Sequence, residues 1–448
     1  MSEPEVAPKW RVVGVACSGA FVAALSTSLV SIAAPVMARE LEVSQAAVGW
    51  VLSAYLLTVS GLLAGIGRLA DVLGRRRVYV AGFAVFAVMS AACGAAPNLP
   101  LLVAARVLQA VGAAALMATG PAIITSAFPA RLRARALGLQ LAATYLGLTL
   151  GPTIGGVLTS ALGWHAVFYA VAAAAGVSAV IAALLLERDP PRATTNAPPL
   201  DIAGSLLFAV GLAALLVALR RGPSTGGATE SFAALMAMAV LAFVLFVRHE
   251  SSHPAPVLPL TLLRTPAFAF GITGAMLLYL ATYILSWLLP FHLQQARGMD
   301  PRHAGALMTA QPAAMAVVAP FSGWISDRFG PRVPSVAGML VIAGGMALVG
   351  RTASSGELGL VVSLTVVGVG AGLYVAPNNA VIMSAVPRDR QGTASAMAAT
   401  ARTVGMTCGV ALAVLLRDVM GLGGALAVSA AVALVGAVLG AVRPVNAA

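Results

Sequence analysis

Long apolar runs follow one another along almost the whole chain, and short polar segments separate them. Each run is about 20 residues long, the length of helix that crosses the roughly 30 Å hydrocarbon core of a bilayer. The alternation over roughly ten-residue segments that is typical of membrane β-barrels is missing. We therefore predict an all-α polytopic membrane protein with transmembrane helices at residues 12–36, 47–66, 78–96, 101–123, 136–159, 165–186, 202–219, 231–247, 266–290, 304–325, 334–350, 358–380, 394–415 and 421–441.

Two of these fourteen runs, 202–219 and 231–247, are the shortest and decide the count. If both lay on the membrane surface as a linker, the chain would have twelve spans. Their apolar residues surround the helix instead of forming one stripe, which favours insertion. The first run is too long for a cleaved signal and keeps polar residues in its second half, so we expect it to be a span as well.

Composition and charge support a membrane protein and suggest its orientation. Only 9% of the residues are charged, whereas a soluble domain carries roughly a quarter. Most of the 27 Lys and Arg residues fall in alternate connections, beginning with the N-terminal tail. This bias predicts that both termini are cytoplasmic, with Arg220 and Arg221 as an exception. It also explains the net charge of +12 through contact with lipid head groups, so we expect membrane lipid and no nucleic acid as partners.

The chain shows none of the usual signatures of an enzyme. Cys17, Cys93 and Cys408 lie in apolar runs without paired spacing, as expected of free thiols that pack as small hydrophobic groups. We find no phosphate-binding loop, no cluster of His and Cys ligands and no nucleophile arrangement. The sequence predicts no catalytic residues, no cofactor and no metal site.

A short motif occurs twice, as GRLADVLGRRR at residues 67–77 and as GWISDRFGPR at residues 323–332. Its glycines should allow a tight turn and close helix contact, and its aspartate can accept hydrogen bonds from a neighbouring helix N-terminus. Two copies indicate two homologous bundles, the architecture of rocking transporters. The residues predicted to act in gating through this motif are Gly67, Asp71, Gly74, Arg75, Gly323, Asp327 and Gly330.

These features resemble the major facilitator superfamily. The duplicated loop is similar to the family's signature loop, and RVLQAVGAA at 106–114 resembles its span-four motif, with Ala110 replacing a glycine. GLTLGPTIGG at 147–156 resembles the span-five motif that is found mainly in exporters. With two spans inserted between the halves, the chain resembles the fourteen-helix drug:proton antiporter branch.

The resemblance implies the major facilitator fold, with two six-helix bundles and two extra helices between them. The expected division is a cytoplasmic tail at 1–11, a first bundle at 12–186, a linker region with the two extra helices at 187–265, a second bundle at 266–442 and a cytoplasmic tail at 443–448.

The resemblance also suggests roles for single residues. Arg106, Gln109, Asp71 and Arg402 are expected in transport and coupling, although both arginines could instead snorkel to an interface. Asp71 would help to close the cytoplasmic side by contacting the helix start near Thr393 and Ser395. Alternatively, it would only stabilise the turn of the motif at residues 67–77. A kinked, closely packed span five would come from Gly147, Gly151, Pro152, Gly155 and Gly156, with helix packing alone as the alternative role.

The stretch LSTSLVSIAAP at residues 25–35 departs from the family pattern. Related antiporters carry Asp and Asn where this chain has Ser26 and Ser31, and no other helix centre supplies a carboxylate. The serines, Ser28 above all, could simply bond back to carbonyls one turn earlier. We expect a neutral or positive cavity, whose predicted lining is Ser26, Ser31, Tyr55, Gln140, Tyr145, Tyr279, Tyr283, Trp287, Gln311, Asn378 and Asn379.

The resulting functional prediction is export of amphiphilic small molecules, neutral or anionic, in exchange for protons. Protons would use Asp71 or another carboxylate near a span end, with Arg106 adjusting how readily it takes up a proton. The alternatives are a proton-independent facilitator or uptake carrier, and a lipid-handling or sensor protein of the same fold. The Ala- and Arg-rich composition, with the single lysine Lys9, suggests a bacterial inner membrane, where carriers of this design commonly work as monomers.

Overall fold

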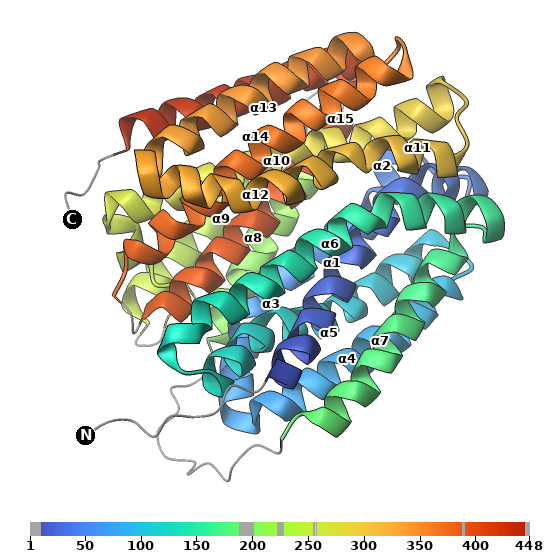
Figure 1. The fold of residues 1–448 in the computed structure, drawn as a ribbon. Helices are drawn as coiled ribbons and strands as arrows, with labels where there is room; N and C mark the ends of the chain where they lie inside the picture. The colour runs from blue at the N-terminus through green and yellow to red at the C-terminus, as the bar shows by residue number, and fades with distance from the viewer. Residues whose placement is uncertain are drawn as a thin grey trace, which may run out of the picture.

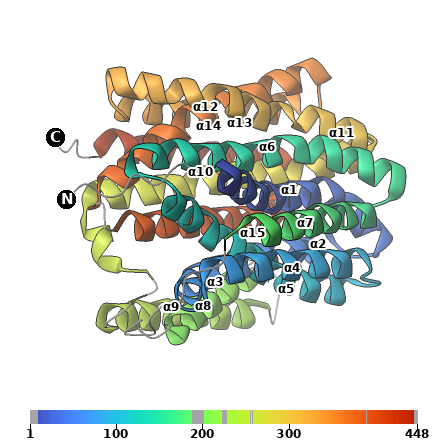
Figure 2. The same ribbon diagram turned by 60° about the horizontal axis from the view of Figure 1, so that its bottom comes forward.

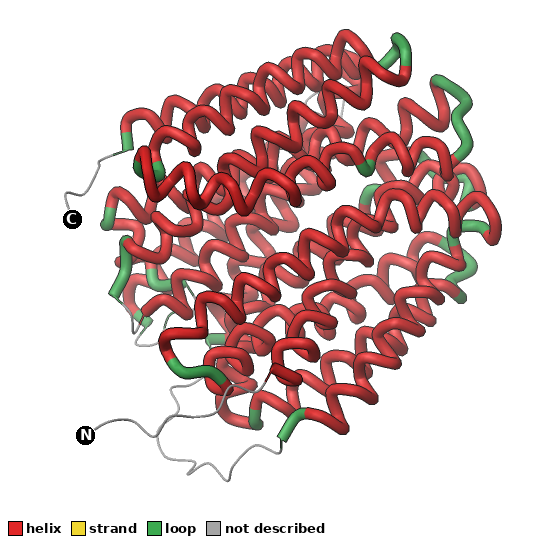
Figure 3. The backbone as a smooth tube through the Cα atoms, in the orientation of Figure 1, coloured by secondary structure: helices red, strands yellow, loops and turns green. Residues whose placement is uncertain are grey.

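The computed structural model describes residues 10–187, 201–221, 228–253, 256, 258–387 and 390–443. These residues form long helices joined by short loops, and no strand occurs among them (Figure 3). Backbone amides in a bilayer must find their partners within the protein, which is why apolar runs of this length fold as helices. Residues 1–9 and 444–448 of the two predicted tails, and most of the connection before residue 201, lie outside the described residues.

The first half of the chain forms one bundle (Figure 1). Its helices are α1 (Trp10–Glu40), α2 (Gln45–Val48), α3 (Trp50–Leu73), α4 (Arg75–Gly94), α5 (Leu99–Ala127), α6 (Ala130–Leu162) and α7 (His165–Leu185). Within the bundle α1 packs against α6, α3 against α5, and α4 against both α5 and α7.

The second half forms a corresponding bundle (Figure 1). Its elements are α10 (Pro266–Phe291), the π-helix η2 (His292–Ala296), α11 (Pro301–Met308), α12 (Ala310–Phe329), α13 (Arg332–Thr352), α14 (Glu357–Ser384) and α15 (Gln391–Val442). Here α10 packs against α15, and α14 packs against both α12 and α13. The two halves meet where α6 contacts α11, where α3 contacts α15 and where α1 contacts α10.

The helix α15 consists of two predicted spans joined without a loop. Gly421 interrupts its 52 residues with φ of 69° and ψ of −175°, a conformation that glycine adopts without steric cost. Among the described residues, twelve helices are long and apolar enough to cross a membrane when α15 counts as one. The apolar helix at 203–219 is shorter. Helices therefore occupy all fourteen predicted places, while fourteen membrane crossings stay a prediction.

The inserted pair α8 (Ile202–Arg221) and α9 (Ala228–Ser252) lies on the flank of the bundles, beside α3 (Figure 2). Leu212 and Leu216 of α8 pack with Ala411 of α15 in one buried cluster. After α9 the chain passes through the 3-10 helix η1 (Leu260–Arg264) into α10.

Asp201 begins α8, because its Oδ1 accepts a hydrogen bond of 2.8 Å from the backbone amide of Gly204. Burial raises the pKa of this carboxyl, but the Gly204 amide and the neighbouring His249 lower it more, so its pKa lies below the usual value.

The two copies of the repeated motif form equivalent turns. Gly74 joins α3 to α4 with φ of 103°, and Gly330 joins α12 to α13 with φ of 77°. Both values lie in the left-handed region, where a side chain would be strained. The first glycine of each copy differs from the sequence-based expectation of close helix contact. A Cβ on Gly67 would meet Ala118 at an ordinary 3.8 Å, and one on Gly323 would meet nothing within 4 Å.

Candidate functional site

Arg106 of α5 lies at the centre of a buried polar network in the first bundle. Its side chain is 0% exposed, so it does not snorkel to the outer interface. Its Nε donates to the Val51 carbonyl at 3.0 Å, and its Nη1 donates to Ser26 Oγ at 3.1 Å. Nη1 also donates to Gln109 Oε1, and the Gln109 amide donates to Ser90 Oγ.

None of these Arg106 partners carries a negative charge. The guanidinium has five N–H donors, and its Nη2 has no hydrogen-bond partner among the described residues. The ring of Tyr55 lies 4.1 Å from the guanidinium carbon, which gives a cation–π contact. A buried charge without a counter-ion is costly. The first bundle therefore holds a buried positive charge that has no counter-ion among these partners.

The hydroxyl groups of α1 divide between local and distant partners. Thr27 and Ser31 donate to carbonyls three residues earlier, as expected for hydroxyls that pack within their own helix. The same expectation for Ser28 is wrong, because its Oγ donates to the Leu148 carbonyl of α6 at 3.1 Å. Ser26 is fully buried and turns toward Arg106. Ser26 and Ser31 stand where the antiporters that the chain resembles carry Asp and Asn. Ser26 contacts the buried Arg106, whereas Ser31 forms its hydrogen bond within α1.

A narrow cavity in the second bundle, with room for about one water molecule, is lined in part by Arg402. Three residues of the predicted lining occur here, Tyr279 of α10 and Asn378 and Asn379 of α14, together with Arg402 of α15, which was predicted to act in coupling. Arg402 lies 6.0 Å from the centre of the Tyr279 ring, so it faces the cavity. The Asn378 amide donates to the Gly271 carbonyl at 2.9 Å and thereby holds α14 against α10. The full lining is Ala275, Leu278, Tyr279, Tyr374, Val375, Asn378, Asn379, Ala398 and Arg402 and contains no carboxylate.

The predicted aromatic lining residues lie in or against two neighbouring buried clusters. Tyr145 of α6 and Tyr279 of α10 belong to one buried cluster that both halves share, and Tyr283 packs against it. Trp287 is buried in the neighbouring cluster together with Tyr55. Its indole Nε1 has no hydrogen-bond partner among the described residues. This indole can donate a hydrogen bond only after the surrounding packing opens.

The remaining predicted lining residues lie apart from the cavity. Gln140 of α6 is buried against α5, where a Cβ on Gly120 would lie 2.6 Å from its side-chain nitrogen. Gln311 of α12 lies against α14, because a Cβ on Gly368 would meet the backbone carbonyl oxygen of Gln311. Neither side chain belongs to the group around Arg402 in this conformation.

The glycines of α6 face two different neighbours. Added Cβ atoms on Gly147, Gly151 and Gly155 would lie 2.6, 2.3 and 2.5 Å from atoms of α1, so these three glycines allow α6 to pack closely on α1 within the first bundle. A Cβ on Gly156 would instead lie 2.4 Å from the Pro301 carbonyl of α11, across the boundary between the halves. At the same boundary, a Cβ on Gly305 of α11 would meet the backbone carbonyl of Pro152 in α6.

Hydrogen bonds connect the two halves at the end where α1 and α6 finish. Thr153 Oγ1 and Thr309 Oγ1 are 2.7 Å apart, and Ser160 Oγ donates to Asp300 Oδ2 at 2.8 Å. The Gln294 amide of η2 donates to the Ile32 carbonyl of α1 at 2.8 Å. Together with Gly156 and Gly305, these contacts close the bundle at this end.

Asp71 lies near the end of α3, at the end of the first bundle opposite to these contacts. Its Oδ1 accepts from Arg75 Nη2 at 3.0 Å and from Arg75 Nε at 3.2 Å, and Arg75 also donates to the Ala122 carbonyl of α5. Val51, which binds Arg106, and Asp71 are separated by roughly 30 Å along the same helix. Arg106 therefore does not act directly on Asp71, contrary to the sequence-based expectation. The contact with the helix start near Thr393 and Ser395 stays a prediction for another conformation.

Sequence reasoning missed several residues of the site. Ser90 and Phe168 complete the surroundings of Arg106, and Tyr374 lines the cavity. Each is one polar or aromatic residue in an apolar run, without a motif that would single it out. Gln294 carried a clearer signal, as a glutamine near the end of a span.

The chain is similar to known proteins over almost its whole length. The sequence profile of the family described as Major Facilitator Superfamily matches residues 16–272 and 271–446. The chain is 32% identical over 406 residues to the riboflavin transporter RibZ of Clostridioides difficile, covering 90% of this chain and 87% of that protein. It is 33% identical over 395 residues to the multidrug resistance protein Stp of Mycobacterium tuberculosis, covering 88% of this chain and 73% of that protein.

A solved structure shares the fold at much lower sequence identity. The D-xylose–proton symporter superposes with a TM-score of 0.72 at 13% identity, covering 98% of each chain. At this identity the likeness concerns the arrangement of the helices and not the cargo.

Proposed function

Because the chain belongs to the major facilitator superfamily, we propose that it is a secondary active transporter that exports neutral or anionic amphiphilic molecules in exchange for protons. The family and the relatives named above are transporters, and one of them is named as a multidrug resistance protein. Export is further supported by GLTLGPTIGG at residues 147–156, which resembles the exporter motif.

The charge around the site carries the proposal on cargo. Arg106 is buried among neutral partners, and Arg402 lines a cavity of tyrosines and asparagines without a carboxylate. A cationic cargo would meet positive charge from both bundles. An anionic cargo would relieve the cost of burying a guanidinium, and a neutral aromatic one could stack on the tyrosines.

Alternating access would use the contacts between the halves as one gate. The positive-inside pattern of the sequence predicts that the end with Thr153, Thr309 and Gln294 is on the outer side. The cavity lies nearer the other end, because Asn378 and Asn379 belong to the last part of α14 and Arg402 belongs to the first part of α15. We assign this structure to the conformation that is closed outside, and outward opening would break the Thr153–Thr309 contact.

A disulfide across this gate is expected to stop transport. In a background with Cys17, Cys93 and Cys408 replaced by alanine, the double variant Thr153→Cys/Thr309→Cys should lose most of its transport after oxidation. Reduction should restore it, because the bond only prevents the halves from separating. Cargo flux into vesicles before and after oxidation is the measurement. Each single variant is the control, and continued transport by the oxidised, cross-linked double variant would contradict the gate.

The function can be tested in sealed proteoliposomes that contain a pH-sensitive dye. Two aromatic amphiphiles of the same skeleton, one with a carboxylate and one with a quaternary ammonium group, are added in turn. We expect the anionic compound to cross and to move protons in the opposite direction. Equal transport of the cationic compound would overturn the proposed cargo class, and empty vesicles control for passive leakage.

A second candidate is a carrier that moves the same cargo without protons. It is favoured because the only acidic residues that are buried among the described residues, Asp201 and Glu250, belong to the ends of α8 and α9 and not to the cavity. Cargo flux without a change in internal pH would select this candidate over antiport.

A further inference from the structure

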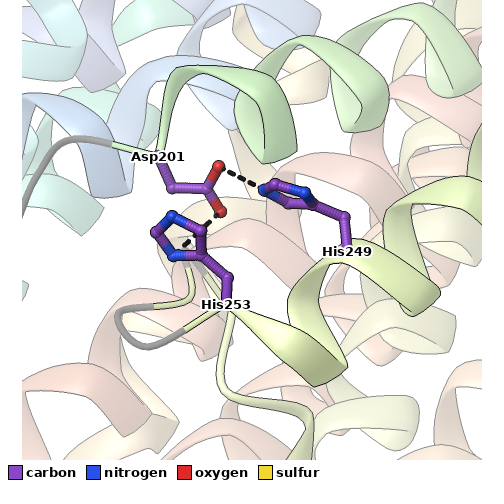
Figure 4. A group of neighbouring side chains, drawn as sticks. All are labelled: Asp201, His249 and His253. Carbon is purple, nitrogen blue, oxygen red and sulfur yellow. Dashed lines mark hydrogen bonds and ion pairs between the residues drawn. The ribbon is translucent and has the colours of Figure 1, made fainter.

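Two histidines and an aspartate meet where α8 begins and α9 ends (Figure 4). Asp201 directly precedes α8, His249 lies in the last turn of α9, and His253 follows that helix. A spacing of four residues places the two histidines on one side of the helix end. One ligand atom from each of the three residues lies within 4.8 Å of the others.

The geometry points to a binding site for a divalent transition-metal ion of the zinc type, held by Asp201, His249 and His253. Asp201 Oδ1 lies 2.7 Å from His249 Nε2, and its Oδ2 lies 3.9 Å from His253 Nδ1. The Asp201 side chain is only 1% exposed, and this Oδ2 has no hydrogen-bond partner among the described residues. A carboxylate oxygen buried in this way next to imidazole nitrogens is a ready ligand.

A second buried carboxylate lies beside this group of three residues. Glu250 is 4% exposed, and its Oε2 accepts from the Leu258 amide at 3.3 Å. A Cβ on Gly204 would lie 2.5 Å from Asp201 Oδ2 and 2.9 Å from Glu250 Oε1, so both carboxylates approach the same point. Glu250 therefore adds a further carboxylate to the group formed by Asp201 and the two histidines.

The donor set selects the class of metal. Zinc binds imidazole nitrogen and carboxylate oxygen in tetrahedral sites, and three protein ligands leave one position for water or a further carboxylate. Magnesium and calcium prefer oxygen ligands throughout, so they suit a pair of histidines poorly. Glu250 is close enough to serve as the fourth ligand or to orient a water molecule.

The position of the site suggests what the ion would do. Beyond His253, the carbonyl of Pro256 accepts a hydrogen bond of 2.6 Å from Arg68 of α3. Arg68 lies within the repeated motif at residues 67–77, beside Asp71 and Gly74. An ion that ties the start of α8 to the end of α9 would therefore be held three residues before the carbonyl that contacts α3. Its role would be to stabilise the inserted pair against the first bundle, independently of the cargo cavity.

Zinc titration of the purified full-length protein tests the site. The protein is prepared in detergent, freed of any polyhistidine tag and stripped with a chelator, and zinc is added in a calorimeter. We expect one ion per chain, and cobalt in its place should give the visible absorption of a tetrahedral site. Asp201→Asn and His253→Gln should weaken binding by about tenfold or more, since each removes a direct ligand.

The variants separate metal binding from folding. Asn at position 201 can still accept the Gly204 hydrogen bond, so α8 should keep its start. His303→Gln is the matched control, because His303 also pairs with a carboxylate, Glu357 at 3.1 Å, but on the exposed surface. Zinc should raise the unfolding temperature of the wild type and of His303→Gln, but not that of Asp201→Asn. No saturable zinc binding by the wild type, or equal binding by Asp201→Asn and His253→Gln, would overturn the proposal.

Discussion

Replacing Ser26 with aspartate is expected to weaken the preference of the transporter for anionic over cationic cargo. Ser26 Oγ lies 3.1 Å from Arg106 Nη1, so a carboxylate at this position would pair directly with the buried guanidinium. It would also offer acceptors to Nη2, which has none among the described residues. The pair would be neutral, and repulsion of cationic cargo by Arg106 would largely disappear.

We expect Ser26→Asp to change the ratio of anionic to cationic transport by about tenfold or more, since juxtaposed like charges cost several kcal/mol and 1.4 kcal/mol corresponds to a factor of ten. The two amphiphiles with a common skeleton provide the measurement. Ser26→Asn is the matched control, because asparagine has nearly the same size and shape without the charge. Equal changes in both variants would show that size at this position, and not charge, controls selection.

The Ser26→Asp variant should also be more stable than the wild type. A hydrogen-bonded counter-ion removes part of the cost of burying Arg106. The unfolding temperature in detergent should rise for Ser26→Asp and should not rise for Ser26→Asn. This result would show that serine at position 26 lowers the stability of the protein, as expected for a residue that is retained for function.

Replacing Arg106 with glutamine is expected to abolish most transport of anionic cargo. Glutamine can donate to one or two of the acceptors but cannot reach the Val51 carbonyl, Ser26 and Gln109 together. Hydrogen bonds to charged groups contribute about 1.5–3 kcal/mol, so we expect a loss of about 10- to 100-fold in transport rate. Initial rates at equal protein content in the vesicles are the measurement.

The control for Arg106→Gln is Arg297→Gln. Arg297 is a partly exposed arginine directly after η2, and it donates to the Ala353 carbonyl at 3.3 Å. We expect it to transport normally. If both variants lost transport equally, the effect would reflect general damage to folding or insertion. If Arg106→Gln transported the anionic compound at the wild-type rate, the charge argument for the cargo would fail.

The sequence by itself determined the helices, because this part of the fold is local. Backbone groups in a bilayer must be satisfied within each segment, so apolar length alone predicts a helix at every place where the structure has a long one. The turns at Gly74 and Gly330 were equally readable, since a positive φ depends on one residue. The missing carboxylate at position 26 is also a property of the sequence.

Only the tertiary structure decided which side chains meet. These helices are apolar on all sides, so their sequences do not specify how each is rotated against its neighbours. That rotation brings Ser26 to Arg106, 80 residues away, and sends the Ser28 hydroxyl to Leu148 of α6. It also turns Gly151 toward α1 and Gly156 toward α11.

The site of Asp201, His249 and His253 shows the same division. The spacing of the two histidines was visible in the sequence, although no metal site was predicted from it. The third ligand lies 48 residues earlier in the chain and joins them only because α8 and α9 pack side by side. Local chemistry therefore fixed where helices form and turn, whereas the contacts that give this protein its sites depend on how those helices pack.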